Sequence, residues 1–320
     1  MPIPSAGPRG KEQWPVLPFA AWKETAATLH MWTQIVGKVR LALSPWLNHS
    51  WHVTFYVTAR GLTTSPIAHG RHCFEIDFDF IDHLLFVRRS DGAQRTIPLR
   101  PMAVADFYEQ LMTALREMEL AVRISAAPNE VEPAIPFAQD RTHAAYDAEF
   151  AQRFWRVLLQ TDRVFKEFRA RFIGKCSPVH FFWGSFDLAV TRFSGRPAPQ
   201  HPGGVPHLPD PVAREAYSHE VSSAGFWPGN EAMPEPVFYS YAYPAPEGFA
   251  AASVRPAEAF WSTALREFML PYEVVRTAEN PDETLLAFLQ STYEAAARLG
   301  NWERETLEHG GAWPATKRVL

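Results

Sequence analysis

The stretch FEIDFDFIDHLLFVRRSDGAQRTIPL, residues 74–99, decides the fold of the first part of the chain. Apolar residues at positions 74, 76, 78 and 80 alternate with acidic residues, which is the period of a β-strand. A two-residue turn at Ile81-Asp82 would place Phe78 opposite Leu85, and Asp91-Gly92 is typical of a second hairpin turn. The pattern therefore predicts three consecutive antiparallel strands.

Helices and further strands are expected on both sides of this stretch. Apolar residues spaced three and four apart predict helices over 20–43, 104–118, 147–175, 256–270 and 281–299. Aromatic and β-branched runs predict strands over 51–58, 121–125, 179–193 (bent at Gly184), 219–227 and 237–243. The fold class that follows is α+β, with antiparallel sheet elements flanked by four or five helices.

The chain is expected to be organised as two halves. Residues 1–18 are rich in proline and predict a flexible arm, 19–126 a first α+β half, 127–146 a linker, 147–300 a second α+β half and 301–320 a mobile tail. A shift of 133 residues superimposes Trp22 on Trp155 and Ser44-Pro45 on Ser177-Pro178. This favours an internal duplication, and the boundary between two related halves is a common place for a ligand pocket.

Composition narrows the function classes. The 320 residues are 47% hydrophobic and 21% charged, which excludes wholesale disorder, and the net charge of −4 argues against a protein that coats nucleic acid. No apolar run is long enough for a membrane span, and the start MPIPSAGPRGKEQW has no apolar signal core. Cys73 and Cys176 are too few for a disulfide framework. We expect a soluble, cytoplasmic protein without nucleic-acid or membrane partners; the oligomeric state stays open.

The widely shared catalytic motifs are absent. The sequence contains no phosphate loop, GxGxxG, HExxH or GxSxG pattern. The absence of these motifs argues against a nucleotide-dependent enzyme, a zinc protease and a lipase. The sequence predicts no particular cofactor.

One polar stripe lies on the first predicted helix. His30, Gln34 and Lys38 are four residues apart, so they share a face that is suited to bind a carboxylate or phosphate while His30 moves protons. The alternative interpretation is a solvated helix face.

Further candidates are scattered along the chain. His180, Asp187 and His219 are, with His30, the candidate catalytic residues, because an imidazole and a carboxylate can form an acid–base pair. The candidate ligand-binding residues are the polar and basic side chains suited to an anion, namely Gln34, Lys38, Arg60, Lys166, Arg169 and Arg192. For each of them a salt-bridged, solvated or buried structural role is the alternative.

Two groups of residues raise the question of a metal. His201, His207 and His219 are nitrogen donors of the kind that zinc, iron or manganese accept, and Asp77, Asp79 and Asp82 are oxygen donors for a hard cation. Neither group has a diagnostic spacing, so we assign no metal ligand. Cys176 follows a predicted helix end, where a thiol is not activated as a nucleophile.

Several strings resemble one known family. They are LHMWTQIVGKVRLAL (29–43), YVTARGLTTSPI (56–67), FKEFRARFIGKCSPVHFFWGSFDLAVTRFSG (165–195), HPGGVPH (201–207) and YSHEVSSAGFWPG (217–229). The chain is similar in these segments, and over roughly residues 14–300, to the bacterial domain-of-unknown-function family 5996. The resemblance implies a bacterial protein folded as one unit, and it brings no activity, cofactor or catalytic residue.

Three function classes remain open. The favoured one is a small-molecule-binding protein or enzyme with a polar pocket for an anionic ligand between the two halves. A non-catalytic scaffold, whose titratable groups would be exposed or paired, is the second. A metal-dependent hydrolase that uses His201, His207 and His219 is the third.

Overall fold

The stretch 74–99 forms the three predicted strands in the computed structural model, which describes residues 13–204 and 208–309. Strands β4 (His72–Asp79), β5 (Leu84–Arg89) and β6 (Gln94–Pro98) are antiparallel, and Phe78 faces Leu85 as expected. Two aspartates of this region have basic partners: Asp77 pairs with Arg88, and Asp79 with Arg60. The predicted register is therefore confirmed.

Three short strands complete a first six-stranded antiparallel sheet. They are β1 (Tyr56–Val57), β2 (Gly61–Thr63) and β3 (Ile67–His69); the order is β1-β2-β4-β5-β6, with β3 paired to β4. Helices α2 (Phe19–Leu43) and α3 (Val104–Glu117) accompany this sheet, and the Trp32 ring of α2 stacks on Phe107 of α3 at 4.8 Å.

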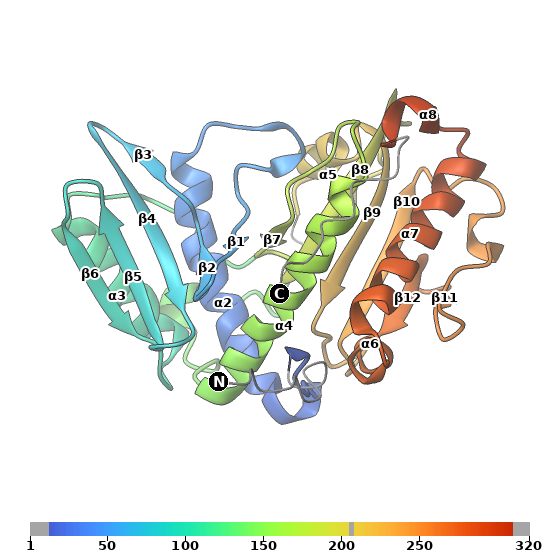
Figure 1. The fold of residues 1–320 in the computed structure, drawn as a ribbon. Coiled ribbons are helices and arrows are strands. Elements are labelled where there is room, and N and C mark those ends of the chain that lie inside the picture. Colours follow the sequence, from blue (N-terminus) through green and yellow to red (C-terminus); the bar gives the residue numbers. More distant parts are fainter. Residues whose placement is uncertain (1–12, 205–207, 310–320) are drawn as a thin grey trace, which may run out of the picture.

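The second half holds a second six-stranded antiparallel sheet. Its strands are β7 (His180–Phe182), β8 (Asp187–Pro197), β9 (His219–Trp227), β10 (Val237–Tyr243), β11 (Phe260–Ser262) and β12 (Glu267–Pro271), in the order β11-β12-β10-β9-β8-β7. Helices α4 (Ala148–Ala170) and α7 (Pro281–Leu299) cover one face of this sheet (Figure 1). The opposite face is where the candidate site lies.

Shorter elements occupy the connections. They are the helices α5 (Asp210–Ala216), α6 (Tyr272–Thr277) and α8 (Arg304–Leu307), and the 3₁₀ turns η1 (Asn48–Ser50), η2 (Phe137–Gln139) and η3 (Phe249–Ala251). Together with the two sheets these helices confirm the α+β class.

The two sheets meet edge to edge. Phe55 and Phe181 exchange two backbone hydrogen bonds, of 2.9 and 2.8 Å, which link the β1 edge to the β7 edge. Trp22 of α2 lies against Phe154 of α4, with ring centroids 5.1 Å apart. One hydrophobic core therefore runs through both halves.

The predicted helix over 256–270 is wrong, because these residues form the hairpin β11–β12. Trp261 and Phe268 face each other across the hairpin with ring centroids 5.1 Å apart, and Phe249 packs on Phe268. Strand β12 also pairs with β10. These cross-strand contacts outweigh the helix propensity of the short Ala-Leu-Arg segment between the strands.

Two predicted strands are also corrected. Residues 121–125 form no strand, although Val122 and Ile124 pack against the core. Within 51–58, residues 51–53 form a turn and bend, and pairing starts only at Phe55. Each segment has the residue composition of a strand, but no neighbouring strand pairs with its backbone along its whole length.

The ends of the described chain are packed. Within the expected N-terminal arm, Trp14 and Leu17 are buried, and the Tyr272 hydroxyl donates to the Pro15 carbonyl at 2.7 Å. Within the expected C-terminal tail, residues 304–307 form α8 and Glu308 bridges to Phe172. The remaining parts of the arm and tail, 1–12 and 310–320, lie outside the described residues.

The order of elements is similar in the two halves. Each begins with a long helix, continues through six strands and ends with a helix that follows them, α3 in the first half and α7 in the second. An internal duplication stays a prediction.

Candidate functional site

A cavity of about 710 Å³ lies on the face of the second sheet opposite α4 and α7. Side chains alternate between the two faces of a strand, so alternate residues of five strands reach the cavity while their neighbours enter the core. These floor residues are His180 and Phe182 of β7, Asp187, Ala189, Thr191 and Phe193 of β8, Val221, Ser223 and Trp227 of β9, Tyr239 and Tyr241 of β10, and Glu267 and Met269 of β12.

The roof of the cavity comes from other parts of the chain. The end of α2 contributes Lys38 and Leu41, the segment 46–53 follows it, and α5 covers the far side. Residues 125–130, which end the expected first half and begin the expected linker (127–146), close the remaining side, and we call them the strap. The cavity is thus lined by both halves of the chain.

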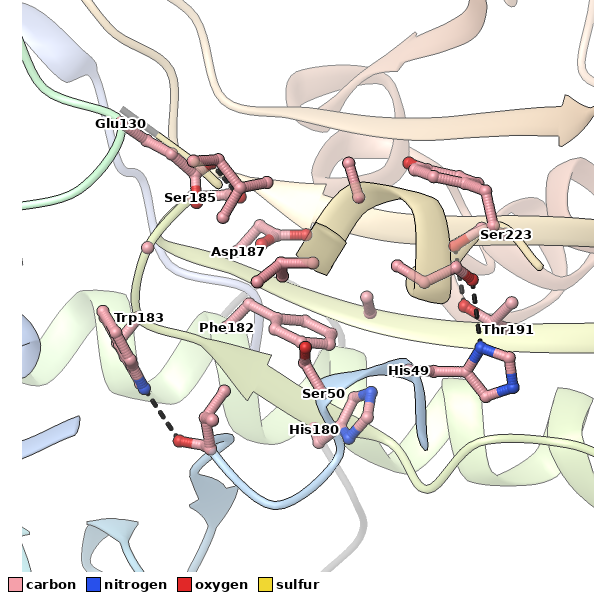
Figure 2. Close-up of a pocket in the computed structure, with 18 of the residues that line it drawn as sticks. His49, Ser50, Glu130, His180, Phe182, Trp183, Ser185, Asp187, Thr191 and Ser223 are labelled. Atoms are coloured by element: carbon pink, nitrogen blue, oxygen red, sulfur yellow. Dashed lines mark hydrogen bonds between the residues drawn. The ribbon is translucent and has the colours of Figure 1, made fainter. Parts of the chain in front are cut away.

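Aromatic rings make up much of the cavity wall. The Trp183 ring is fixed because its Nε1 donates to the Val53 carbonyl at 2.7 Å (Figure 2). A Cβ on Gly37 would lie 2.3 Å from this ring, so α2 can pass here only with a glycine. The other large rings among the described wall residues are Trp46, Trp51, Phe182, Phe193, Tyr217, Trp227, Tyr239 and Tyr241.

Three carboxyl groups line the cavity among the residues that the structure describes. Asp187 is only 6% exposed; it accepts a hydrogen bond from the Tyr239 hydroxyl, and its Oδ1 has no partner. Glu130 accepts from the Ser185 hydroxyl at 2.8 Å, and Figure 2 shows these two residues at the same end of the cavity as Asp187. Glu267 of β12 is half-buried.

The environment favours the protonated form of these carboxyls. Burial, together with the charge of Glu130, raises the pKa of Asp187 to about 7. Burial and the charge of Asp187 raise the pKa of Glu267 to about 7 as well. Burial also raises the pKa of Glu130. The dominant cause is the same for all three: the charged form has lost water without gaining a cation.

Hydroxyl groups line the opposite end of the cavity. Thr191 and Ser223 share a hydrogen bond of 2.9 Å, as do Tyr217 and Tyr241 at 3.0 Å. Beside them His49 forms a hydrogen bond through Nδ1 with the Ala216 carbonyl, which joins η1 to α5 (Figure 2).

Two nitrogen groups complete the polar lining. Lys38 is buried and donates to the side-chain oxygen of Asn129, and burial lowers its pKa to about 8. His180 is 1% exposed, its Nδ1 has no partner, and burial lowers its pKa to about 3, so the ring is neutral. Among the described lining residues, Lys38 is the sole Lys or Arg.

The predicted helix stripe acts mainly as a clamp for the strap. Gln34 makes two hydrogen bonds with the Asn129 backbone, both of 2.7 Å, and His30 bonds to the Gly184 carbonyl at 2.8 Å. Of the stripe, Lys38 lines the cavity. His180 and Asp187 line it too, so three predicted site residues come together there.

The predicted basic residues lie elsewhere. Arg60 pairs with Asp79 and Asp82, Lys166 with Asp162, and Arg169 donates to the Ser177 carbonyl. Arg192 is buried on the other face of the sheet, stacked on Phe168 and Tyr293. The anion pocket expected from these four side chains is therefore not assembled; each satisfies a local partner instead.

The histidines predicted for the metal hydrolase do not form a described metal site. His201 stacks on Tyr217, His219 contacts Ser218, and His207 lies outside the described residues. Residues 13–204 and 208–309 contain no group of three or more potential ligands arranged around a metal. The Asp77, Asp79 and Asp82 carboxylates are taken up by arginines. Burial raises the pKa of Cys176 to about 11, which agrees with an inert thiol.

Sequence reasoning missed four residues that define the cavity: Glu130, Tyr239, Tyr241 and Glu267. The run VFYSYAY offered a signal, because alternating tyrosines on one strand face are typical of a half-polar surface. Glu130 stood in an unpatterned segment and Glu267 in the wrongly predicted helix, so neither had a usable signal.

Fold and cavity together define a class: a single-chain α+β protein with a large aromatic-walled cavity on one sheet face. The chain belongs to the family of unknown function DUF5996, whose model matches residues 14–309. No curated protein and no solved structure matches it. Within the described residues, none of the helices has the length and apolar character needed to cross a bilayer.

Proposed function

We propose that this protein binds a small organic molecule in the cavity over the second sheet. The observation that carries the proposal is a cavity of about 710 Å³ that contains buried polar atoms without partners, Asp187 Oδ1 and His180 Nδ1. Ligand sites typically have this volume, with apolar walls and a few fixed polar groups. Leaving such a buried group unsatisfied costs roughly 1–3 kcal/mol, which a bound molecule would offset.

The alternative of a scaffold is less well supported. A protein that acts through its surface needs no cavity, and its titratable groups would be exposed or paired. Asp187 is neither exposed nor paired with a cation in the described residues. We therefore place the proposed binding function first, in the cytoplasmic setting that the sequence leads us to expect.

The same lining suits proton transfer. A carboxyl whose pKa is close to the working pH exchanges protons efficiently with a bound substrate. Asp187 meets this requirement, because burial raises its pKa to about 7 although the hydrogen bond that it accepts from Tyr239 acts in the opposite direction. If the ligand is turned over, we propose Asp187 as the acid–base group.

A blocked cavity provides the test. Ala189→Trp places a large ring on the cavity floor, and Val212→Trp does so from α5; Ala257→Trp, on an exposed loop, is the matched control. We expect a ligand-observed NMR fragment screen to yield hits that bind the wild type and Ala257→Trp but not the two blocked variants. Circular dichroism checks that all variants fold. Hits that bind blocked and unblocked proteins equally would refute the proposal.

A further inference from the structure

The cavity has an excess of acidic groups that its own residues do not balance. Among the described lining residues, Glu130, Asp187 and Glu267 stand against the one ammonium of Lys38, which is already bonded to Asn129. An anionic ligand in this cavity would lie beside three carboxyl groups and beside one ammonium that already donates to Asn129. A ligand that brings positive charge would lower the raised pKa values of these carboxyls and stabilise their ionised form, so the lining favours a cation over an anion.

None of the three carboxyls has a basic partner among the described residues. Glu130 is bonded to a serine and Asp187 to a tyrosine, while Glu267 has no described hydrogen bond. Buried carboxylates are normally paired with a cation, because the lost hydration is otherwise not replaced. The unpartnered Oδ1 of Asp187, a residue 94% buried, marks where the missing donor would bind.

The three carboxyls act on one another and on the same tyrosine. The charge of Glu130 acts on Asp187, the charge of Asp187 acts on Glu267, and both Asp187 and Glu267 act on Tyr239. They are nevertheless not grouped tightly enough to form a metal site within the described residues. This spacing suits an organic cation with several N–H donors, which reaches separate acceptors at once.

We propose that the cavity selects an organic amine, whose ammonium group is bound between Asp187, Glu130 and Glu267 and whose apolar body lies against the tryptophan and tyrosine rings. The inference rests on the proposed function and names its ligand class. Aromatic walls suit both parts of such a ligand, because rings bury an apolar body and attract a neighbouring cation. The wall already shows this contact: Lys38 Nζ lies 5.6 Å from the centre of the Trp183 ring.

Three sets of probes with matched bodies test the charge preference. The amines are 2-phenylethylamine and tryptamine, the neutral counterparts are 2-phenylethanol and tryptophol, and the anions are phenylacetate and indole-3-acetate. Titration calorimetry or NMR at neutral pH measures each dissociation constant. We expect the amines to bind about tenfold tighter than the alcohols, since a charge-assisted hydrogen bond is roughly twice as strong as a neutral one.

Charge-removing variants identify the partners. Asp187→Asn and Glu267→Gln should each reduce the amine preference, and Glu258→Gln, an exposed carboxylate outside the cavity, should leave it unchanged. Glu267 has no described hydrogen bond, so Glu267→Gln keeps the test valid even if Asp187→Asn fails to fold.

The outcomes separate the two proposals. The inference is supported if the affinity ratio of amine to alcohol is smaller in Glu267→Gln than in the wild type. Alcohols or anions that bind as tightly as the amines, and lose binding in Ala189→Trp, overturn the amine class while the cavity remains a binding site. Probes that bind wild type no better than Ala189→Trp overturn both.

Discussion

Asp187 combines features that stability alone would not select. Its carboxyl is buried beside Tyr239, feels the charge of Glu130 and has one oxygen without a partner. An asparagine has almost the same shape and no charge to desolvate. Residues that lower stability in this way are typical of binding and catalytic sites, where the group is used by the ligand.

This reasoning predicts a pH-dependent gain of stability in Asp187→Asn. An unfolded aspartate has a pKa near 3.9, whereas burial raises that of native Asp187 to about 7. Between these values the native state holds a proton that the unfolded state has lost, so the contribution of Asp187 is largest below about pH 4 and falls as the pH rises to about 7. Thermal melts should therefore show Tm of the variant minus Tm of the wild type increasing from pH 4 to pH 7 and levelling above it.

The comparison between variants isolates this effect. The pKa values of His30 and His180 are lowered to about 4 and about 3 by burial, so these residues make the whole protein less stable as the pH falls below about 6.5. That opposite trend is present in both proteins and cancels in the difference. A constant difference in Tm across the whole range would contradict the unpaired state of Asp187.

Some of the predicted site residues line the cavity and others do not, and the difference has a physical reason. The type of a residue limits the chemistry that it can perform, and Lys38, His180 and Asp187, which were predicted as site residues on that basis, do line the cavity. Arg192 has the same chemistry as a ligand-binding arginine, yet it lies against Phe168 on the opposite face of the sheet. One position along β8 changes the face, and the sequence does not say which face carries the cavity.

Among the elements, helix α2 holds the strap in place. The side chain of Gln34 satisfies the N–H and the C=O of Asn129 together, and Lys38 binds the Asn129 side chain. A strap of irregular backbone needs such partners, because its polar groups have no neighbouring strand. The clamp fixes Glu130, the next residue, at the cavity wall.

Gln34→Ala is therefore expected to loosen the strap. Loss of both hydrogen bonds leaves buried backbone groups without partners, at a cost of about 1–3 kcal/mol in the free energy of unfolding. Hydrogen exchange followed by mass spectrometry should show faster exchange over 125–131, and ligand affinity should fall with it. Gln160→Ala, on the side of α4 near Arg163, is the control that should leave strap exchange unchanged. Unaltered exchange in Gln34→Ala would contradict the clamp.

Elements made by local pairing were the predictable ones. Strands β4 to β6 follow from neighbouring hairpins, because each apolar residue meets its partner within about twenty residues of chain. The hairpin β11–β12 depends on a partner far along the chain, since β12 pairs with β10 and Phe249 packs on Phe268. The pattern of residues within 256–270 contains no information on contacts with distant segments, so it predicted a helix there.

At the scale of the whole molecule, the cavity exists because the two halves are joined. The second sheet supplies the floor, while α2, the segment 46–53 and the strap supply most of the roof. The sequence predicted two α+β halves with a pocket near their boundary, but a composite site depends on long-range packing and cannot be assembled from local patterns. The link between the sheets, Phe55 to Phe181, lies within the same aromatic core as Phe78 and Phe154.

This shared core predicts that both halves unfold together. Phe55 is 1% exposed, and Phe55→Ala should cost about 3–5 kcal/mol through lost packing. Because the core is continuous, urea denaturation of wild type and variant should each show one transition, coincident by tryptophan fluorescence and by far-ultraviolet circular dichroism. Phe260→Ala, at an exposed site in β11, is the matched control and should change the midpoint little. Two separated transitions, with only the first moved by Phe55→Ala, would show that the halves fold independently and would remove the structural reason for a cavity built from both.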